Sequence, residues 1–156
     1  MKLYLAGPDV FRPDAERWAT AARALCQAAG HQALLPLDQE AATAAAICAN
    51  NLRLIAAADG VVANLNPFRG AEPDSGTCVE IGYALALGKC VVGYAADLRP
   101  LRERLAVPGA GGGCCDATGW QVEDFGLPLN LMLAVPLRLA QGRLEEALGL
   151  LAEGAE

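Results

Sequence analysis

The chain has 156 residues, of which 54% are hydrophobic and 19% are charged, and its formal net charge at pH 7 is -6. A chain of this length suits one domain that buries about two-thirds of the surface of its unfolded state. The negative charge argues against a nucleic-acid binder, which needs a basic face. No apolar stretch reaches the roughly 18–20 residues of a membrane span, and no signal-peptide core is found, so we expect a cytoplasmic protein that binds a small molecule.

The first third of the chain alternates strand and helix patterns. Residues 2–6 form an apolar run that predicts a first strand. Apolar residues then recur with helical spacing over residues 15–29, and Gly30 is placed to end that helix. Residues 32–35 are expected to form a second strand, and residues 43–58 a second helix.

Asn51 is the unusual residue of the second predicted helix. It lies on the stripe that also carries four apolar residues, Ile47, Cys48, Ile55 and Ala58. A polar side chain on a buried face costs free energy unless it is hydrogen-bonded. Either Asn51 forms a structural hydrogen bond to a neighbouring strand end, or it faces a ligand.

The centre of the chain reads as strand, long polar loop, helix and strand. Residues 61–65 are an apolar run typical of a buried parallel strand, residues 75–88 are expected to be helical, and residues 90–94 form the next strand. The loop after a parallel strand opens onto the edge of the sheet where ligands bind. Alternating strands and helices predict an α/β fold with a doubly wound parallel sheet, a flavodoxin-like three-layer sandwich, in a single domain.

Two carboxylates, Asp74 and Glu80, surround the start of the central helix. A carboxylate in a first helical turn lies near unpaired N–H groups and the positive end of the dipole, which favour its ionised form. Such a place suits a carboxylate nucleophile. The alternative is a capping box in which Glu80 only bonds the backbone of Thr77. Asp74 has a similar alternative as a turn or cap residue.

The remaining segments carry weaker signals. Residues 108–113 are glycine-rich but lack the Gly-Lys-Ser/Thr of a phosphate loop, so a flexible surface loop is expected. A fifth strand is expected at residues 121–124. The six cysteines include no CxxC, and four of them lie in apolar patterns, so we expect buried free thiols and no metal or cofactor.

Residues 129–139 have almost no polar face. Every residue except Asn130 and Arg138 is apolar. A helix that is apolar all round is usually buried, and in a small domain its extra faces are expected to meet another subunit. Asn130 is otherwise a turn or cap residue that follows Pro128.

Four strings of the chain together resemble the nucleoside 2-deoxyribosyltransferase family. They are YLAGPDVF, ADGVVANLNPFRG, DSGTCVEIGYALALGK and EDFGLPLNLML, and the match runs from Tyr4 to about Leu133. The resemblance implies exchange of the base of a 2'-deoxynucleoside with retention of configuration. Glu80 is then the nucleophile that forms a covalent deoxyribosyl ester, Asp74 shuttles the proton of the base, and Tyr4 holds the nucleophile. The alternative for Tyr4 is an ordinary aromatic residue of the first strand.

The resemblance also implies residues around the base. Asn51 faces the base at a position where the family often has an aspartate, and an amide cannot supply a proton. Gly7 is expected beside the substrate. Phe11, Phe68 and Arg69 either frame the base or, as aromatic residues in loops commonly do, only pack against their surroundings. Which bases are exchanged depends on the geometry of these loops.

Asn130 and Met132 match the NLM motif of the family. The resemblance implies that both reach into the active site of a neighbouring subunit, where Asn130 bonds the 5'-hydroxyl of the sugar. The expected partners are therefore a 2'-deoxynucleoside, a free nucleobase and further copies of the chain, as a dimer or higher homo-oligomer with shared active sites. No nucleic-acid polymer and no membrane are expected as partners.

Two other functions remain open. A 2'-deoxynucleoside 5'-monophosphate N-glycosidase resembles this family in fold and uses a similar glutamate, but it needs a 5'-phosphate pocket, and Ser75 is the only serine of the chain. A non-catalytic nucleotide-binding module on the same fold has no need for Asp74, Glu80 and Tyr4 together.

Overall fold

The computed structural model describes residues 1–38, 43–107 and 114–153. Within these residues the strands form a parallel five-stranded sheet in the order β2-β1-β3-β4-β5. The strands are β1 Lys2–Ala6, β2 Gln32–Leu34, β3 Gly60–Asn64, β4 Cys90–Ala95 and β5 Arg138–Gln141. This order confirms the predicted doubly wound, flavodoxin-like sheet.

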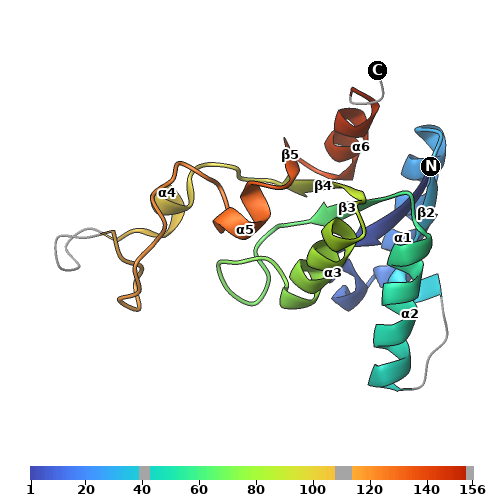
Figure 1. Cartoon of the computed structure of the whole chain (residues 1–156), viewed down its shortest axis with the longest axis horizontal. Helices are drawn as coiled ribbons and strands as arrows, with labels where there is room; N and C mark the ends of the chain where they lie inside the picture. Colours follow the sequence, from blue (N-terminus) through green and yellow to red (C-terminus); the bar gives the residue numbers. More distant parts are fainter. Residues whose placement is uncertain (39–42, 108–113, 154–156) are drawn as a thin grey trace.

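Helices cover both faces of the sheet (Figure 1). The α-helices are α1 Ala15–Ala28, α2 Ala44–Ala57, α3 Ser75–Ala86, α4 Leu101–Leu105, α5 Leu131–Ala134 and α6 Leu144–Ala152, and the short 3-10 helices are η1 Pro8–Phe11 and η2 Pro36–Asp38. α1 and α6 pack on one face, and α2 and α3 pack on the other. No helix among the described residues is both long enough and apolar enough to traverse a bilayer.

Alternation along the strands divides the core in two. In β1, Leu3 and Leu5 face α1 and α6, whereas Tyr4 and Ala6 face α2 and α3. Strand β3 is buried along its whole length, as expected for a central parallel strand. Tyr4 therefore points from the middle of the sheet toward the helix that carries Glu80.

The prediction of a fifth strand at residues 121–124 is wrong. Strand β5 lies at Arg138–Gln141 and pairs with β4, so that Val92 is in register with Arg138. Gln121 forms only an isolated antiparallel bridge with Cys115. The short β5 is partly exposed at the edge of the sheet, which leaves it without the long apolar run that marks a central strand.

The prediction of a long apolar helix over residues 129–139 is also wrong. Only Leu131–Ala134 is helical, and the chain then turns at Pro136 into β5. Proline has no N–H for an intrahelical hydrogen bond, so the helix cannot continue through it. Met132 and Val135 are 73% and 70% exposed, whereas Leu133 is buried against the core under α2 and α3.

Each of the six cysteines is a free thiol. Of the four expected in the core, Cys26 is buried and Cys78 is half-buried against it, whereas Cys48 and Cys90 are exposed, so the expectation is wrong for these two. Among the described residues, no group of three or more His, Cys, Asp or Glu side chains is arranged to hold a metal ion. The glycine-rich segment at residues 108–113 lies outside the described part of the chain. The segments that flank it, between β4 and α5, extend away from the sheet (Figure 1).

Candidate active site

Tyr4 and Glu80 form the centre of the candidate site. The Tyr4 hydroxyl donates a hydrogen bond of 2.6 Å to Oε1 of Glu80. Tyr4 comes from the middle of β1 and is fully buried, and Glu80 comes from the second turn of α3. Because both residues are built on regular elements, the position of this carboxylate is fixed by the packing of α3 on the sheet.

Asn51 of α2 approaches the same carboxylate oxygen. Its Nδ2 donates to Oε1 of Glu80 over 3.4 Å, while its Oδ1 is buried and has no hydrogen-bond partner among the described residues. The structure thus brings Tyr4 and Glu80 together as the sequence suggested, and it adds a contact from Asn51 to Glu80 that neither interpretation of Asn51 predicted. The apolar stripe beside Asn51 is only half buried, because Ile55 is enclosed but Ile47 is 46% exposed.

Asp74, and not Glu80, caps the helix. α3 begins at Ser75, and Oδ2 of Asp74 accepts hydrogen bonds from the backbone N–H of Thr77 at 3.0 Å and from its hydroxyl at 3.2 Å. The capping-box interpretation of Glu80 is therefore wrong, and the cap interpretation of Asp74 is correct for one of its oxygens. The other oxygen, Oδ1, makes no hydrogen bond within the described part of the chain, so it remains available to a ligand.

The electrostatics of the site differ from the expectation based on the helix dipole. Burial raises the pKa of Glu80 to about 6, the negative charge of Asp74 adds to this rise, and the hydrogen bonds from Tyr4 and Asn51 oppose it. Glu80 lies in the second turn of α3, beyond the free N–H groups of the first turn, so desolvation outweighs the dipole. Burial and the nearby Glu80 raise the pKa of Tyr4, which keeps its hydroxyl a hydrogen-bond donor.

An aromatic cluster lies at the same edge of the sheet. The rings of Phe11 and Phe68 stack with centroids 5.4 Å apart and planes inclined by 13°. The guanidinium of Arg69 lies 5.1 Å from the centroid of Phe11 and 4.7 Å from that of Phe68. Phe11 is 56% exposed, so its ring faces solvent rather than the core. We call these three residues the aromatic cluster.

Gly7 has a packing role at the end of β1. A Cβ at this position would lie 2.8 Å from Cβ of Asn64 and 3.1 Å from Oδ2 of Asp9. Asp9 and Asn64 are themselves buried and joined by a hydrogen bond of 2.7 Å. This pair was not predicted from the sequence, although the polar Asn64 at the end of β3 was a signal that its side chain has a partner.

Asn130 and Met132 do not meet Glu80 within one chain. They line a pocket of about 650 Å³ against Cys78, Ile81 and Gly82 of α3, and neither Glu80 nor Tyr4 lines it. Asn130 caps α5 by accepting a hydrogen bond from the N–H of Met132, and its Nδ2 donates to Glu123. The cap interpretation of Asn130 is therefore correct.

A half-buried carboxylate held by a phenol and an amide at the carboxyl edge of a parallel sheet fits an enzyme that transfers a glycosyl group. The chain belongs to the nucleoside 2-deoxyribosyltransferase family, whose model matches residues 3–132.

Similar proteins agree with this assignment. A 2-desoxiribosyltransferase from Leishmania mexicana superposes with a TM-score of 0.86 at 38% identity, covering 99% of both chains. An uncharacterised protein of Schizosaccharomyces pombe is 31% identical over 90% of this chain and 78% of its own length. A CMP N-glycosidase from Clostridium botulinum shares the fold, with a TM-score of 0.52 at 15% identity and 98% of both chains covered. The family and the Leishmania structure support a glycosyl-transferring enzyme.

Proposed function

We propose that the protein is a nucleoside 2-deoxyribosyltransferase, which exchanges the base of a 2'-deoxynucleoside through a covalent intermediate on Glu80. The observation that carries the proposal is the hydrogen-bonded group formed by Glu80, Tyr4 and Asn51. A module that only binds nucleotides has no need for a half-buried carboxylate restrained in this way. With a pKa of about 6, Glu80 is mostly ionised at neutral pH and less strongly solvated than a surface carboxylate.

In the first half of the reaction the bond between C1' and the base nitrogen breaks, and its electron pair leaves with the base. Positive charge builds on the sugar, as in glycoside cleavage. A carboxylate oxygen of Glu80 attacks C1' from the opposite face and forms a deoxyribosyl ester. Tyr4 holds the other oxygen, Oε1, and so fixes the side chain during the attack.

In the second half an acceptor base attacks C1', and the electrons of the ester bond return to Glu80. Each half inverts the configuration, so the product has the configuration of the substrate. Asp74 hydrogen-bonds the departing and entering bases through Oδ1 and passes the proton between them. Asn51 cannot transfer a proton, but its unpaired Oδ1 can accept a hydrogen bond from the base or the sugar.

The proposal includes a homo-oligomer with shared active sites. Asn130 and Met132 lie beside the side of α3 that carries Cys78 and Gly82. Glu80 of the same chain does not line the pocket between them. Met132 and Val135 are exposed apolar side chains, and the segments between β4 and α5 reach away from the sheet (Figure 1). A second copy that covers this region would receive Asn130, which then binds the 5'-hydroxyl of the sugar.

Incubation with deoxyinosine, with and without adenine, tests the proposal. A transferase forms deoxyadenosine and hypoxanthine, and the nucleoside product has the β configuration. An N-glycosidase releases hypoxanthine without forming deoxyadenosine, and it is expected to prefer the 5'-monophosphate. Absence of both reactions across a panel of deoxynucleosides and bases contradicts the enzymatic assignment.

A further inference from the structure

A chain of hydrogen bonds runs along the carboxyl edge of the sheet. Asp9 Oδ2 accepts from Nδ2 of Asn64 at 2.7 Å. Asn64 Oδ1 accepts from Asn66, both from its side-chain Nδ2 at 2.7 Å and from its backbone N–H at 3.1 Å. Asn66 Oδ1 accepts in turn from the backbone N–H of Ala96 at 2.9 Å. These bonds connect η1, the end of β3, the loop after β3 and the loop after β4.

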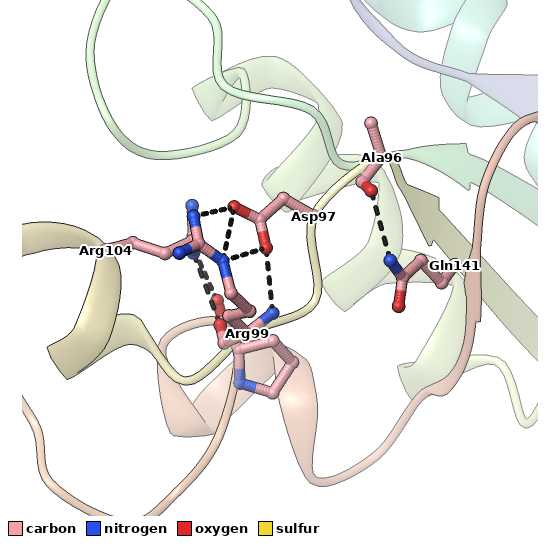
Figure 2. Close-up of polar contacts among 6 residues, drawn as sticks. Ala96, Asp97, Arg99, Arg104 and Gln141 are labelled. Atoms are coloured by element: carbon pink, nitrogen blue, oxygen red, sulfur yellow. Dashed lines mark hydrogen bonds and ion pairs between the residues drawn. The ribbon is translucent and has the colours of Figure 1, made fainter.

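Ala96, the last member of this hydrogen-bond chain, is also hydrogen-bonded to strand β5. The carbonyl of Ala96 accepts a hydrogen bond of 3.5 Å from Gln141 of β5 (Figure 2). Figure 2 also shows that the carboxylate of the neighbouring Asp97 accepts hydrogen bonds from Arg99 instead. The donors are the backbone N–H and the guanidinium of Arg99. Asp97 therefore lies at the same edge without belonging to the hydrogen-bond chain.

Packing alone does not require polar side chains at the buried positions of Asp9 and Asn64. They are 7% and 9% exposed, and burial raises the pKa of Asp9. The nearest cation, Arg12, lies 3.8 Å away on a half-exposed side chain. Replacing a buried polar pair by apolar groups of similar shape is often neutral or stabilising, so stability alone does not explain the pair. What the pair provides is a directional link between two loops.

Both linked loops carry a ring of the aromatic cluster. Asp9 lies in η1, two residues before Phe11, and Asn66 lies two residues before Phe68. The backbone N–H of Phe68 donates to the carbonyl of Glu72, which closes a tight loop. Arg69 within this loop has φ of 55°, a strained value for a residue other than glycine. Strain of this kind persists where the surroundings fix the conformation, and it concentrates at ligand sites.

We propose that Asp9, Asn64 and Asn66 are positioning residues that hold Phe11 and Phe68 as a stacking platform for the acceptor base, and thereby set the ratio of transfer to hydrolysis. The inference rests on the proposed function and extends it to the fate of the intermediate. None of the three positioning residues is required to touch the reacting atoms.

The chemistry explains why the platform affects one product more than the other. The deoxyribosyl ester on Glu80 is broken by attack at C1', and the bond electrons return to the carboxylate whichever nucleophile attacks. With a base, C1' gains a nitrogen and the base gives up its proton to Asp74. With water, C1' gains a hydroxyl and the released proton goes to Asp74 in the same way. Water reaches C1' without a platform, whereas a base must be held in the attacking geometry, where an error of 1 Å can cost about 10²-fold.

A reciprocal exchange of Asp9 and Asn64 tests the proposal. Asn64→Asp places two carboxylates in contact, and at a pH where both are ionised their repulsion breaks the link between the loops. Adding Asp9→Asn restores an amide–carboxylate pair in the opposite order, and the new aspartate still accepts from Asn66. We expect the transfer-to-hydrolysis ratio to fall by about tenfold or more in the single variant, with a higher KM for the acceptor base, and to recover to within about threefold in the double variant.

Three features keep the result interpretable. The ratio is measured within one protein sample, so a lower fraction of folded enzyme does not change it. Asn66→Ala breaks the same hydrogen-bond chain outside the buried pair and is expected to lower the ratio even if Asn64→Asp does not fold. Asp97→Asn, a substitution at the same edge but outside the hydrogen-bond chain, is expected to leave the ratio unchanged.

Several results would overturn the inference. They are an unchanged ratio in folded Asn64→Asp or Asn66→Ala protein, a parallel loss of transfer and hydrolysis, or a double variant that does not recover. A wild-type protein that hydrolyses or transfers nothing overturns the proposed function as well. That outcome is distinct from an active wild type whose ratio ignores these substitutions.

Discussion

At the scale of a single side chain, two opposing effects act on the pKa of Glu80. Burial raises its pKa to about 6, while the hydrogen bonds from Tyr4 and Asn51 hold its ionised form. An ionised carboxylate at this site is therefore costly for the fold but useful for nucleophilic attack. The same shift predicts that kcat/KM for base exchange falls as the pH drops through about 6, because protonated Glu80 cannot attack.

Glu80→Gln is expected to abolish base exchange and to stabilise the fold at alkaline pH. The folded-state pKa of about 6 exceeds the ordinary value of 4.5, so the free energy of unfolding falls as the pH rises from about 4.5 to 6. Above pH 6, ionised Glu80 lowers the free energy of unfolding of the wild type by at most about 2 kcal/mol. Denaturant unfolding at pH 8 and pH 4 measures this loss: Glu80→Gln is expected to raise the free energy of unfolding at pH 8 and to leave it unchanged at pH 4. Equal gains at both pH values contradict this explanation.

Asp74→Asn separates the catalytic role of Asp74 from its role as a helix cap. The amide oxygen of asparagine still accepts from the N–H of Thr77, so the stability is expected to stay within about 0.5 kcal/mol of the wild type. The proton transfer is lost, and turnover is expected to fall by about 10²–10⁴-fold. Asp74→Ala is the companion variant, because it loses both roles and about 1 kcal/mol of stability. A loss of turnover below about fivefold in Asp74→Asn places the proton donor elsewhere.

At the scale of elements, long apolar runs were predicted well from the sequence. The expected strands at residues 2–6 and 61–65 match β1 and β3 to within a residue, and the expected helix at residues 43–58 matches α2. The strand at residues 121–124 and the helix at residues 129–139 were wrong. Edge strands and short helices depend on tertiary contacts more than on local periodicity, and here β5 is defined by its pairing with β4.

The same distinction applies to the site. Tyr4 and Glu80 stand in strings that resemble a family, and regular elements bring them together. The link from Asp9 through Asn64 to Asn66 joins loops from separate strands, and no local pattern marks it. The cap at Asp74 was weighed as an alternative because aspartate before a helix is a local signal.

Gly93→Ala tests how tightly β4 packs at the level of the element. A Cβ on Gly93 would lie 2.3 Å from Cδ1 of Leu65 and 3.0 Å from Cδ2 of Leu139. The core has to shift, and we expect a loss of about 1–3 kcal/mol in the free energy of unfolding by urea denaturation. Gly149→Ala in α6 is the control: no described atom lies within 4 Å of its added Cβ, and a helical alanine is expected to stabilise by about 0.5–1 kcal/mol. A neutral Gly93→Ala contradicts this account of the packing.

At the scale of the whole molecule, the separation of Asn130 from Glu80 leads to a test by complementation. Glu80→Ala and Asn130→Ala proteins are each expected to be inactive or weak alone. Co-expressed with different tags and purified through both, they form some sites that contain an intact Glu80 from one chain and an intact Asn130 from the other. Activity is then expected to exceed the sum of the two variants.

Two outcomes contradict shared sites. A wild-type protein that elutes as a monomer at working concentration leaves no second chain to supply Asn130. A mixed oligomer that shows no rescue, although wild-type subunits treated in the same way stay active, means that Asn130 serves its own chain or does not act in the site.

The most direct measurement of the central claim is the mass of the protein after incubation with a slow 2-fluoro-2-deoxy nucleoside. The fluorine destabilises the positively charged transition state, so the intermediate accumulates. We predict that the wild type gains the mass of one fluorinated sugar, that peptide mapping places it on Glu80, and that adding an acceptor base removes it. Glu80→Gln protein is expected to gain nothing. A wild type that turns over the nucleoside without an adduct, or with the sugar on another residue, contradicts the assignment of Glu80 as the nucleophile.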